Sequence, residues 1–335
     1  MSIQAITGAQ AARALLTAPP RQIPCDDVTT WRTWWRASGL GRQAPVLIAL
    51  HGGYAADRPG WAFAAGYQAA LRALAAQPAL RTGWPGWAPE DLAALCLTEP
   101  TGNRPRDLQA TGRPTAEGGW QLDGHKRWTT LGTACDQLLV VARDADVPVP
   151  EGAPPRLAAW VVPVAAPGVA LQAMPPTAFV PEVPHATLAL AAVHLPAAAR
   201  LPGDGWNEVG KPFRTLEDTL VPMAMLAHLL AEAQRLQWPT GWRQRALATL
   251  TALAAVAEAP PLDAATHVLL AGALDQAHAL YAEADACYTA TPGNPAATRW
   301  ARDRPLLGVA RGAREQRAAV AWQRLAAAVA ASPGG

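Results

Sequence analysis

The stretch that decides the fold is Leu97-Thr98-Glu99-Pro100, followed by Lys126-Arg127-Trp128-Thr129-Thr130 and the apolar run 137–142. Threonine and tryptophan favour strands, and the pattern is typical of a β-hairpin-like region that presents hydroxyl groups and one indole. Thr98 and Thr130 can hydrogen-bond the edge of a flat heteroaromatic ring while Trp128 covers its face. The same residue types are also ordinary in sheets, so this pattern by itself leaves a purely structural role open.

The composition is that of a chain with much apolar material to bury. It has 335 residues, of which 50% are hydrophobic and 16% charged. This length predicts two or three domains, since single cores stop growing near roughly 250–300 residues. The formal net charge is only +2 and no basic cluster stands out, which argues against nucleic acid as a partner. Small molecules are the expected partners.

Cysteine and histidine spacings predict neither a disulfide framework nor a metal site. The four cysteines form no C-x-x-C pair, and the seven histidines form no H-x-x-x-H or H-E-x-x-H motif. The first residues lack the charged start and apolar core of a secretory signal. The sequence also contains no uninterrupted apolar run of about 18 residues, the length needed to span a membrane. We therefore expect a cytoplasmic protein.

The character of the sequence changes twice along the chain. Residues 1–93 are predicted to be helices and loops, residues 94–205 short strands separated by Gly and Pro, and residues 206–335 an antiparallel helical bundle. This order predicts an α+β protein whose middle domain is a small barrel or sandwich. The expected strands are 138–142, 158–164, 169–173 and 187–195. The expected helices are 10–16, 29–37, 66–77, 219–236, 242–258, 261–286 and 313–331.

The order of the central motifs resembles the acyl-CoA dehydrogenase superfamily. Leu97 to Pro100, then Gly102 and Asp107, then 122–130 and 136–143 follow one another as in the family's middle β-domain. The resemblance implies a helical, β, then helical domain order and FAD as cofactor. It also implies a flavin site in which Thr98 hydrogen-bonds the pyrimidine side, Trp128 packs on the isoalloxazine and Thr130 approaches N5. The implied cofactor-binding set is Leu97, Thr98, Trp128, Thr129 and Thr130.

The resemblance also implies where a catalytic base belongs. Family members remove a proton beside a thioester carbonyl, which needs a carboxylate whose pKa is raised by an apolar pocket. The usual base is a Glu directly before a Gly; counted from Arg302-Asp303, that position holds Arg311, and arginine cannot accept a proton. Some relatives carry the base in a Leu-Glu-Arg sequence of the C-terminal bundle. Glu217, in Leu216-Glu217-Asp218, is therefore the candidate base.

Both positions also have structural interpretations. Thr215 with Asp218 resembles a capping box, and an acidic first turn interacts favourably with a helix dipole, which would explain Glu217 without catalysis. Arg311 is interpreted as a solvated residue of a basic turn beside Arg314 and Arg317, or as a residue that binds an anion or pairs with Glu217.

Other departures from the family pattern bear on the cofactor. The loop 101–107 is longer than in the family and carries two arginines, and the motifs that hold the adenosine end of FAD have no clear counterpart between Arg235 and Trp300. Three functions remain open. They are an FAD-dependent acyl-CoA dehydrogenase of fatty acid metabolism, a degenerate partner subunit or binding protein, and an oxidase or monooxygenase of the same fold. The expected partners are acyl-CoA or another acyl thioester, and a second copy or related subunit.

Overall fold

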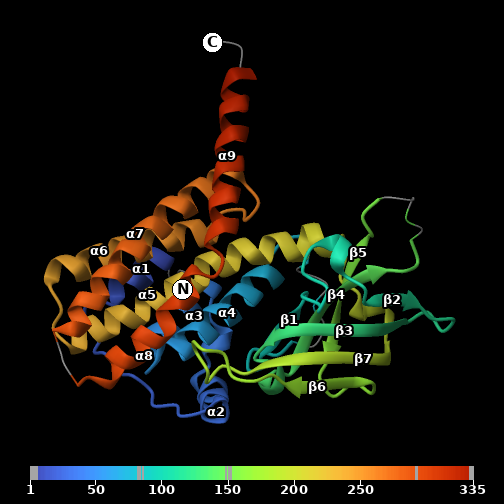
Figure 1. Ribbon diagram of the computed structural model, residues 1–335, viewed down its shortest axis with the longest axis horizontal. Helices are drawn as coiled ribbons and strands as arrows, with labels where there is room; N and C mark the ends of the chain where they lie inside the picture. Colours follow the sequence, from blue (N-terminus) through green and yellow to red (C-terminus); the bar gives the residue numbers. More distant parts are fainter. Residues whose placement is uncertain are drawn as a thin grey trace, which may run out of the picture.

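The computed structural model describes residues 7–331 except 81–83, 85, 86, 148, 150–152, 291 and 292. Helices make up one side of the molecule and a curled sheet the other, and the last helix stands away from both (Figure 1). The α+β class and the helical, β, helical order of elements are confirmed. The first group of helices is α1 (Gly8–Ala14), α2 (Val28–Ser38), α3 (Pro45–Ala55) and α4 (Pro59–Ala75).

The middle of the chain forms one seven-stranded mixed sheet. Strand β4 is central: β5 pairs with nearly its whole length, while β1 and the start of β2 pair with it in parallel on the other side. The order continues from β2 through β3 and β7 to β6. All four predicted strands are confirmed. The strands are β1 (Ala93–Cys96), β2 (Thr111–Pro114), β3 (Trp120–Thr130), β4 (Gln137–Asp144), β5 (Leu157–Pro163), β6 (Val169–Ala173) and β7 (His185–Leu195).

The predicted hairpin between the two motifs is wrong. The first motif, residues 97–100, follows β1, which pairs with β4, whereas the second lies on β3, which pairs with β2 and β7, so the two motifs form no ladder with each other. One backbone hydrogen bond joins them beyond β1, from the Arg127 amide to the Thr98 carbonyl at 2.7 Å. The motifs therefore meet at an edge, through tertiary contacts that sequence proximity does not reveal.

The C-terminal helices are close to the predicted ones, with one important difference. Helix α5 begins at Lys211, eight residues before the predicted start, with Pro212 in its first turn, where proline is favoured. Helices α3 and α8 were not predicted, because α3 is apolar nearly all round and α8 is short. The remaining helices are α5 (Lys211–Arg235), α6 (Thr240–Glu258), α7 (Ala264–Thr289), α8 (Pro295–Asp303) and α9 (Arg311–Ala331).

Helix α5 is the buried axis of the helical side, and glycines allow its neighbours to approach it closely. A Cβ on Gly53 of α3 would lie 2.1 Å from the carbonyl oxygen of Ala224, and one on Gly66 of α4 would lie 2.7 Å from the Cα of Val221. Real side-chain atoms do not approach so closely, so both positions need glycine. These contacts fix the rotation of α5 and thereby the direction in which Glu217 points.

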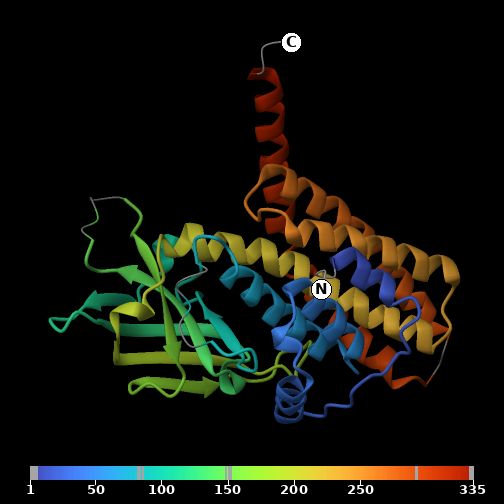
Figure 2. The ribbon, with the colours of Figure 1, turned by 180° about the vertical axis from the view of Figure 1, so that it is seen from behind.

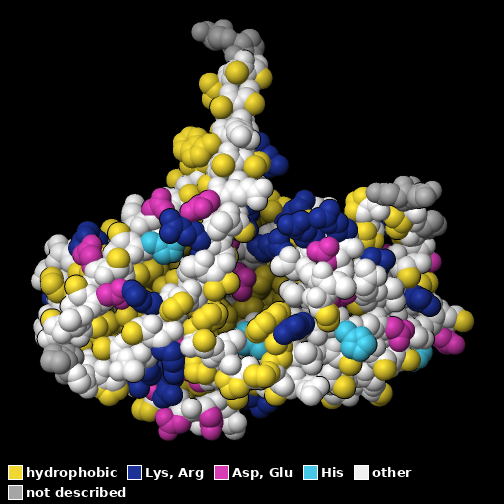
Figure 3. All heavy atoms as spheres, viewed as in Figure 1, with side chains coloured by type: hydrophobic (Ala, Val, Ile, Leu, Met, Phe, Trp, Pro, Cys, Tyr) yellow, Lys and Arg dark blue, Asp and Glu magenta, His cyan; other side chains and the backbone are white. Residues whose placement is uncertain are grey.

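Helix α1 lies on the helical side of the molecule (Figure 1). Seen from behind, α1 packs on α6 (Figure 2), and the Gly8 amide donates to Glu258 Oε1 at 3.3 Å. Helix α9 projects from the body, and Figure 3 shows hydrophobic side chains exposed along it. Trp322 is 60% exposed and Val329 77% exposed. No helix in the described ranges is long and apolar enough to cross a membrane.

A buried ion pair joins β1, β3 and β4. Lys126 Nζ donates to Glu99 Oε1 at 2.6 Å and to the Val141 carbonyl at 2.5 Å, with the lysine and glutamate side chains 0% and 3% exposed. Glu99 also accepts from the backbone amides of Gln109 and Ala110 at 2.6 and 3.1 Å. Burial lowers the pKa of Lys126, opposed by the Glu99 carboxylate. The Glu99 carboxylate is therefore occupied by hydrogen bonds within the protein, and it holds the segments at this edge of the sheet together.

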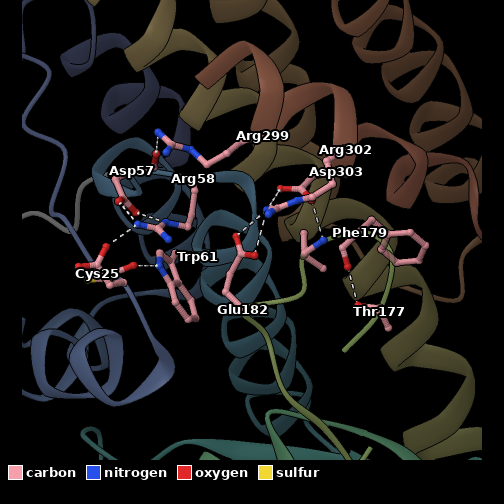
Figure 4. Close-up of polar contacts among 12 residues, drawn as sticks. Cys25, Asp57, Arg58, Trp61, Thr177, Phe179, Glu182, Arg299, Arg302 and Asp303 are labelled. Atoms are coloured by element: carbon pink, nitrogen blue, oxygen red, sulfur yellow. Dashed lines mark hydrogen bonds and ion pairs between the residues drawn. The ribbon is translucent and has the colours of Figure 1, made fainter. Parts of the chain in front are cut away.

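A second polar cluster fastens the loop between β6 and β7 to α8. Arg302 donates to Glu182 at 3.0 and 3.1 Å and to its neighbour Asp303, while Asp303 Oδ1 accepts from the Val180 amide at 2.7 Å (Figure 4). The Asp303 side chain is fully buried. Because η6 (Arg304–Gly308) follows Asp303 directly, this cluster sets where the connection to α9 starts.

Lys126→Met tests the sheet ion pair. The substitution leaves Glu99 buried without its cation, and we expect the free energy of unfolding to fall by about 3 kcal/mol. Urea denaturation followed by far-ultraviolet circular dichroism measures the change. The double variant Glu99→Gln with Lys126→Met should recover part of the loss. A loss below about 1 kcal/mol in the single variant would show that the pair contributes little.

Candidate functional site

Most of the predicted cofactor residues line one cavity with the predicted base. Leu97, Thr98, Trp128, Thr130 and Glu217 border a cavity of about 180 Å³ between the sheet edge and the start of α5. The structure thus brings together residues that lie more than a hundred positions apart in the sequence. The rest of the lining is Tyr67, Leu95, Asn103, Gly210, Phe213 and Arg214.

A β-bulge turns Trp128 outward. The pairing of β3 with β7 shifts between Lys126 and Thr129, and Trp128 has the left-handed φ of +60°. The bulge interrupts the alternation, so Arg127 and Trp128 are both exposed while Lys126 and Thr129 on either side are buried. A bulge at a strand end is a common way to re-aim a side chain at a binding site, and it places the indole at the rim of the cavity.

Thr129 is the one predicted cofactor residue that does not line the cavity. Its side chain is fully buried, and its hydroxyl contacts Cys96 Sγ at 3.7 Å inside the sheet. The hydroxyls of Thr98 and Thr130, in contrast, make no hydrogen bond to any described residue. Two unused hydroxyl groups and an exposed indole remain for a ligand in this cavity.

A second, apolar cavity lies on the other side of Glu217. It has a volume of about 130 Å³ and is bordered by α4, α5, η6 and the residues leading into α9. Glu217 borders both cavities and so lies in the wall between them. Besides Glu217, its lining is Phe63, Asp218, Val221, Pro222, Leu306, Leu307, Val309, Ala310 and Arg314.

The Glu217 carboxyl has the environment of a general base. Protein atoms surround it, while the cavities leave part of the side chain accessible. Desolvation, reinforced by the neighbouring Asp218 charge, raises the pKa of Glu217 to about 8, against the opposing influence of three arginines. No described residue forms a hydrogen bond or ion pair with this carboxyl. A free carboxylate with a raised pKa can take a proton from a weakly acidic carbon.

The capping-box interpretation of Glu217 is wrong. Because α5 begins at Lys211, Thr215 and Asp218 lie in its second turn, where no amide needs a cap. The Thr215 hydroxyl forms no hydrogen bond with any described residue. The Asp218 carboxylate pairs with Arg317 and lies 3.5 Å from Arg314. Glu217 and Asp218 therefore have different surroundings although they are adjacent.

Arg311 is a surface residue and does not pair with Glu217. Its side chain is 73% exposed and its Nε donates to Glu315 Oε1 at 2.8 Å, one turn along α9. The interpretation as a solvated residue is confirmed, and the proposed pair with Glu217 is wrong. Arg311, at the position expected for the usual base, thus borders neither cavity that Glu217 borders.

Several lining residues were not predicted as site residues. Tyr67 and Phe63 lie on α4, and Tyr67 was assigned only to an apolar helix face. Phe213 and Arg214 precede the Leu-Glu-Asp sequence, and Arg214 donates to the Asn103 carbonyl at 3.2 Å and covers the Trp206 ring at 4.7 Å. None of these residues belongs to a motif, although Phe213 stands one helical turn before Glu217 and therefore lies on the same helix face.

Comparison with known proteins defines the class. Residues 94–193 match the family model of the acyl-CoA dehydrogenase middle domain. This match identifies residues 94–193 as resembling an acyl-CoA dehydrogenase middle domain, and the fold of the described chain is similar to that of acyl-CoA dehydrogenases of known structure.

The particular relatives include dehydrogenases and an oxidase. Over 83 residues the chain is 37% identical to the probable acyl-CoA dehydrogenase FadE10 of Mycobacterium tuberculosis, a match that covers 24% of this chain and 12% of that protein. Butyryl-CoA dehydrogenase from Megasphaera elsdenii has the same fold, with a TM-score of 0.64, 15% identity, and 95% and 97% of the two chains covered. The prolyl acyl carrier protein oxidase AnaB aligns with a TM-score of 0.66, 17% identity, and 95% and 98% covered. At these identities the structures establish the fold alone.

The raised pKa of Glu217 predicts a pH-dependent cost to stability. An unfolded Glu titrates near about 4.3, so between that pH and about 8 the folded chain binds the proton more tightly and loses stability as the pH rises. Gln cannot titrate. We expect the melting temperature of Glu217→Gln, relative to wild type, to increase from pH 5 to pH 9 in thermal denaturation.

The exposed Glu315→Gln serves as the control for that measurement. It removes a carboxyl that lies on the surface of α9, so its melting temperature relative to wild type should change little with pH. An equal offset for Glu217→Gln at pH 5 and pH 9 would contradict a raised pKa at Glu217.

Proposed function

We propose that the protein is a flavin-dependent oxidoreductase that introduces a double bond between the α and β carbons of an acyl thioester, with Glu217 as the base. The observation that carries the proposal is the position of Glu217, an unpaired carboxyl in the wall between a cavity lined by ring-binding side chains and an apolar cavity. The middle-domain match supports the same chemistry.

The residues of this chain fit the ring of a flavin. Thr98 and Thr130 offer unused hydroxyls for its polar edge, and the bulge exposes Trp128 for its face. A bound flavin supplies the acceptor for the hydride that leaves the β carbon. The cavity has one cationic lining residue, Arg214, which donates to the Asn103 carbonyl, so the pyrophosphate and adenosine end of FAD require contacts outside it.

Glu217 handles the proton in this proposal. Its carboxylate takes the proton from the α carbon, and the electron pair of that C–H bond becomes the new carbon–carbon double bond as the β hydride departs. Burial supports the step twice, because it raises the affinity of Glu217 for the proton and excludes water that would compete for it. Tyr67 does not take part as an acid, since its hydroxyl accepts the Leu95 amide at 2.8 Å and burial raises its pKa well above the ordinary value.

An absorption spectrum of the purified protein tests the proposal. We expect a flavin spectrum that bleaches when acyl-CoA or an acyl-carrier thioester is added without oxygen, with a rate that rises as the pH passes through about 8, because Glu217 must be deprotonated. Glu217→Gln should retain the bound flavin and lose at least about a hundredfold in the bleaching rate.

Other results of the same experiment would contradict the proposal or favour one of the other functions. A protein that binds neither FAD nor FMN, or a Glu217→Gln variant that bleaches as fast as wild type, would contradict the proposal. The first result would favour a degenerate binding or partner subunit. Rapid return of the flavin colour with oxygen uptake would instead favour an oxidase, the chemistry named for AnaB.

The apolar cavity predicts a preference for short acyl chains. Its volume is roughly 130 Å³, and the side chains of Phe63, Val221 and Leu307 line it together with Glu217, which leaves room for only a few methylene groups. Val221→Ala enlarges the cavity, and we expect the ratio of kcat/KM for octanoyl over butyryl thioester to rise about tenfold, as for added methylenes in a hydrophobic pocket.

Val256→Ala provides the matched control for this change. Val256 is equally buried, at 5% against 7% exposed for Val221, but lies on α6 and borders neither cavity. Its chain-length ratio should equal that of wild type. An unchanged ratio in Val221→Ala would show that the acyl chain lies elsewhere.

A further inference from the structure

Two arginines of α9 reach across to α5 beside the candidate base. Arg317 pairs with Asp218 Oδ2, and Arg314 lies 3.5 Å from Asp218 Oδ1. The three side chains are largely enclosed, with 25%, 12% and 10% of the Arg317, Arg314 and Asp218 side chains exposed. Arg314 also lines the apolar cavity together with Glu217.

The arginines of α9 near Glu217 form ion pairs with Asp218 but not with Glu217 itself. The titratable groups that act on it are Asp218 and Arg214 of α5, and Arg314 and Arg317 of α9; Tyr67 of α4 also faces it. Arg214, which lowers the pKa of Glu217 more than the other two arginines do, donates to the Asn103 carbonyl, covers the Trp206 ring and forms no ion pair with Glu217. Of the two adjacent carboxylates, Asp218 therefore makes the ion pairs with α9, while Glu217 makes none with the described residues.

We propose that Asp218 is a positioning residue: by binding the guanidinium groups of Arg314 and Arg317, it keeps them from pairing with Glu217 and leaves that carboxyl free to act as the base. The inference rests on the proposed function. An arginine in contact with Glu217 would stabilise the carboxylate and weaken it as a proton acceptor. Asp218 prevents this contact by offering the arginines an anion one residue away.

The same contacts fasten α9 to the body. Along α9 only Ala321 is buried, so apolar packing holds this helix weakly. Arg314 contributes in a second way, because it donates to the Leu307 carbonyl at 2.5 Å and so ties α9 to η6. The state of the base and the attachment of α9 thus depend on one set of ion pairs.

The test is a direct titration of Glu217 in the full-length protein. Carboxyl ¹³C signals of glutamate-labelled protein are followed by NMR from pH 5 to pH 10, and the signal absent from Glu217→Gln identifies the residue. In Asp218→Asn the arginines lose their anion and Glu217 also loses a like-charged neighbour, so we expect the Glu217 midpoint to fall by about one pH unit or more. If an arginine then pairs with Glu217, Arg317→Gln should raise the midpoint more in the Asp218→Asn background than in wild type, whereas equal rises would show that Asp218 acts by its own charge alone. In Arg317→Gln one cation is removed while Asp218 stays charged, and we expect the midpoint to rise.

A fall of the Glu217 midpoint in Asp218→Asn together with a rise in Arg317→Gln indicates an electrostatic effect on Glu217. A purely structural role of these residues would not move the midpoint in a defined direction. Glu315→Gln, which removes the exposed partner of Arg311 on α9, should leave the midpoint unchanged. A midpoint that stays or rises in Asp218→Asn, or stays or falls in Arg317→Gln, overturns the inference. If Asp218→Asn does not fold, Arg317→Gln alone decides.

The titration needs no flavin and no substrate, so its outcome is separate from that of the proposed function. Loss of bleaching in Glu217→Gln tests the base itself. If bleaching persists there while the two midpoints move as expected, the charge arrangement stands and the assigned reaction fails. If bleaching is lost but the midpoints do not move, Glu217 is the base without help from Asp218.

Discussion

The ion pair between Lys126 and Glu99 is the constraint on which the candidate site depends. It joins the segment after β1 to β3 and β4 in a region from which water is excluded, and two backbone amides complete the coordination of Glu99. A buried charge without its partner is costly, so this geometry has few alternatives. It fixes Thr98 on one side and the bulge carrying Trp128 on the other. The buried ion pair thus positions Thr98 and Trp128, whose own side chains are uncharged.

Sequence patterns predicted four of the seven strands, β4 to β7, and most of the helices, because most of these elements have a recognisable apolar pattern. They did not predict α3, whose residues are apolar nearly all round, or the pairing of β1 with β4, which depends on contacts distant in sequence. The bulge at Trp128 was also missed. A left-handed φ at tryptophan is unfavourable by itself, and only the neighbouring ladder and the buried Lys126 impose it.

The candidate site was predicted in its motifs but not in its electrostatics. Threonine and tryptophan at the sheet edge could be identified because a short, ordered run contains them. The roles of Glu217 and Asp218 could not be separated, since one sequence step tells nothing about which carboxyl meets α9. Helix geometry separates them: adjacent residues point about 100° apart, so one faces two cavities and the other faces two arginines.

The glycine contacts between α3, α4 and α5 divide the walls of the apolar cavity into a rigid side and an adjustable side. Gly53 and Gly66 lock α5 against its neighbours with no free space, so changes there must disturb the core. The opposite wall consists of η6 and the residues entering α9, which are held by Arg314 and by the Asp303 cluster. Sequence drift along 304–310 can therefore reshape the cavity while the helix that carries Glu217 stays in place. The shape of the apolar cavity can therefore change independently of the position of Glu217.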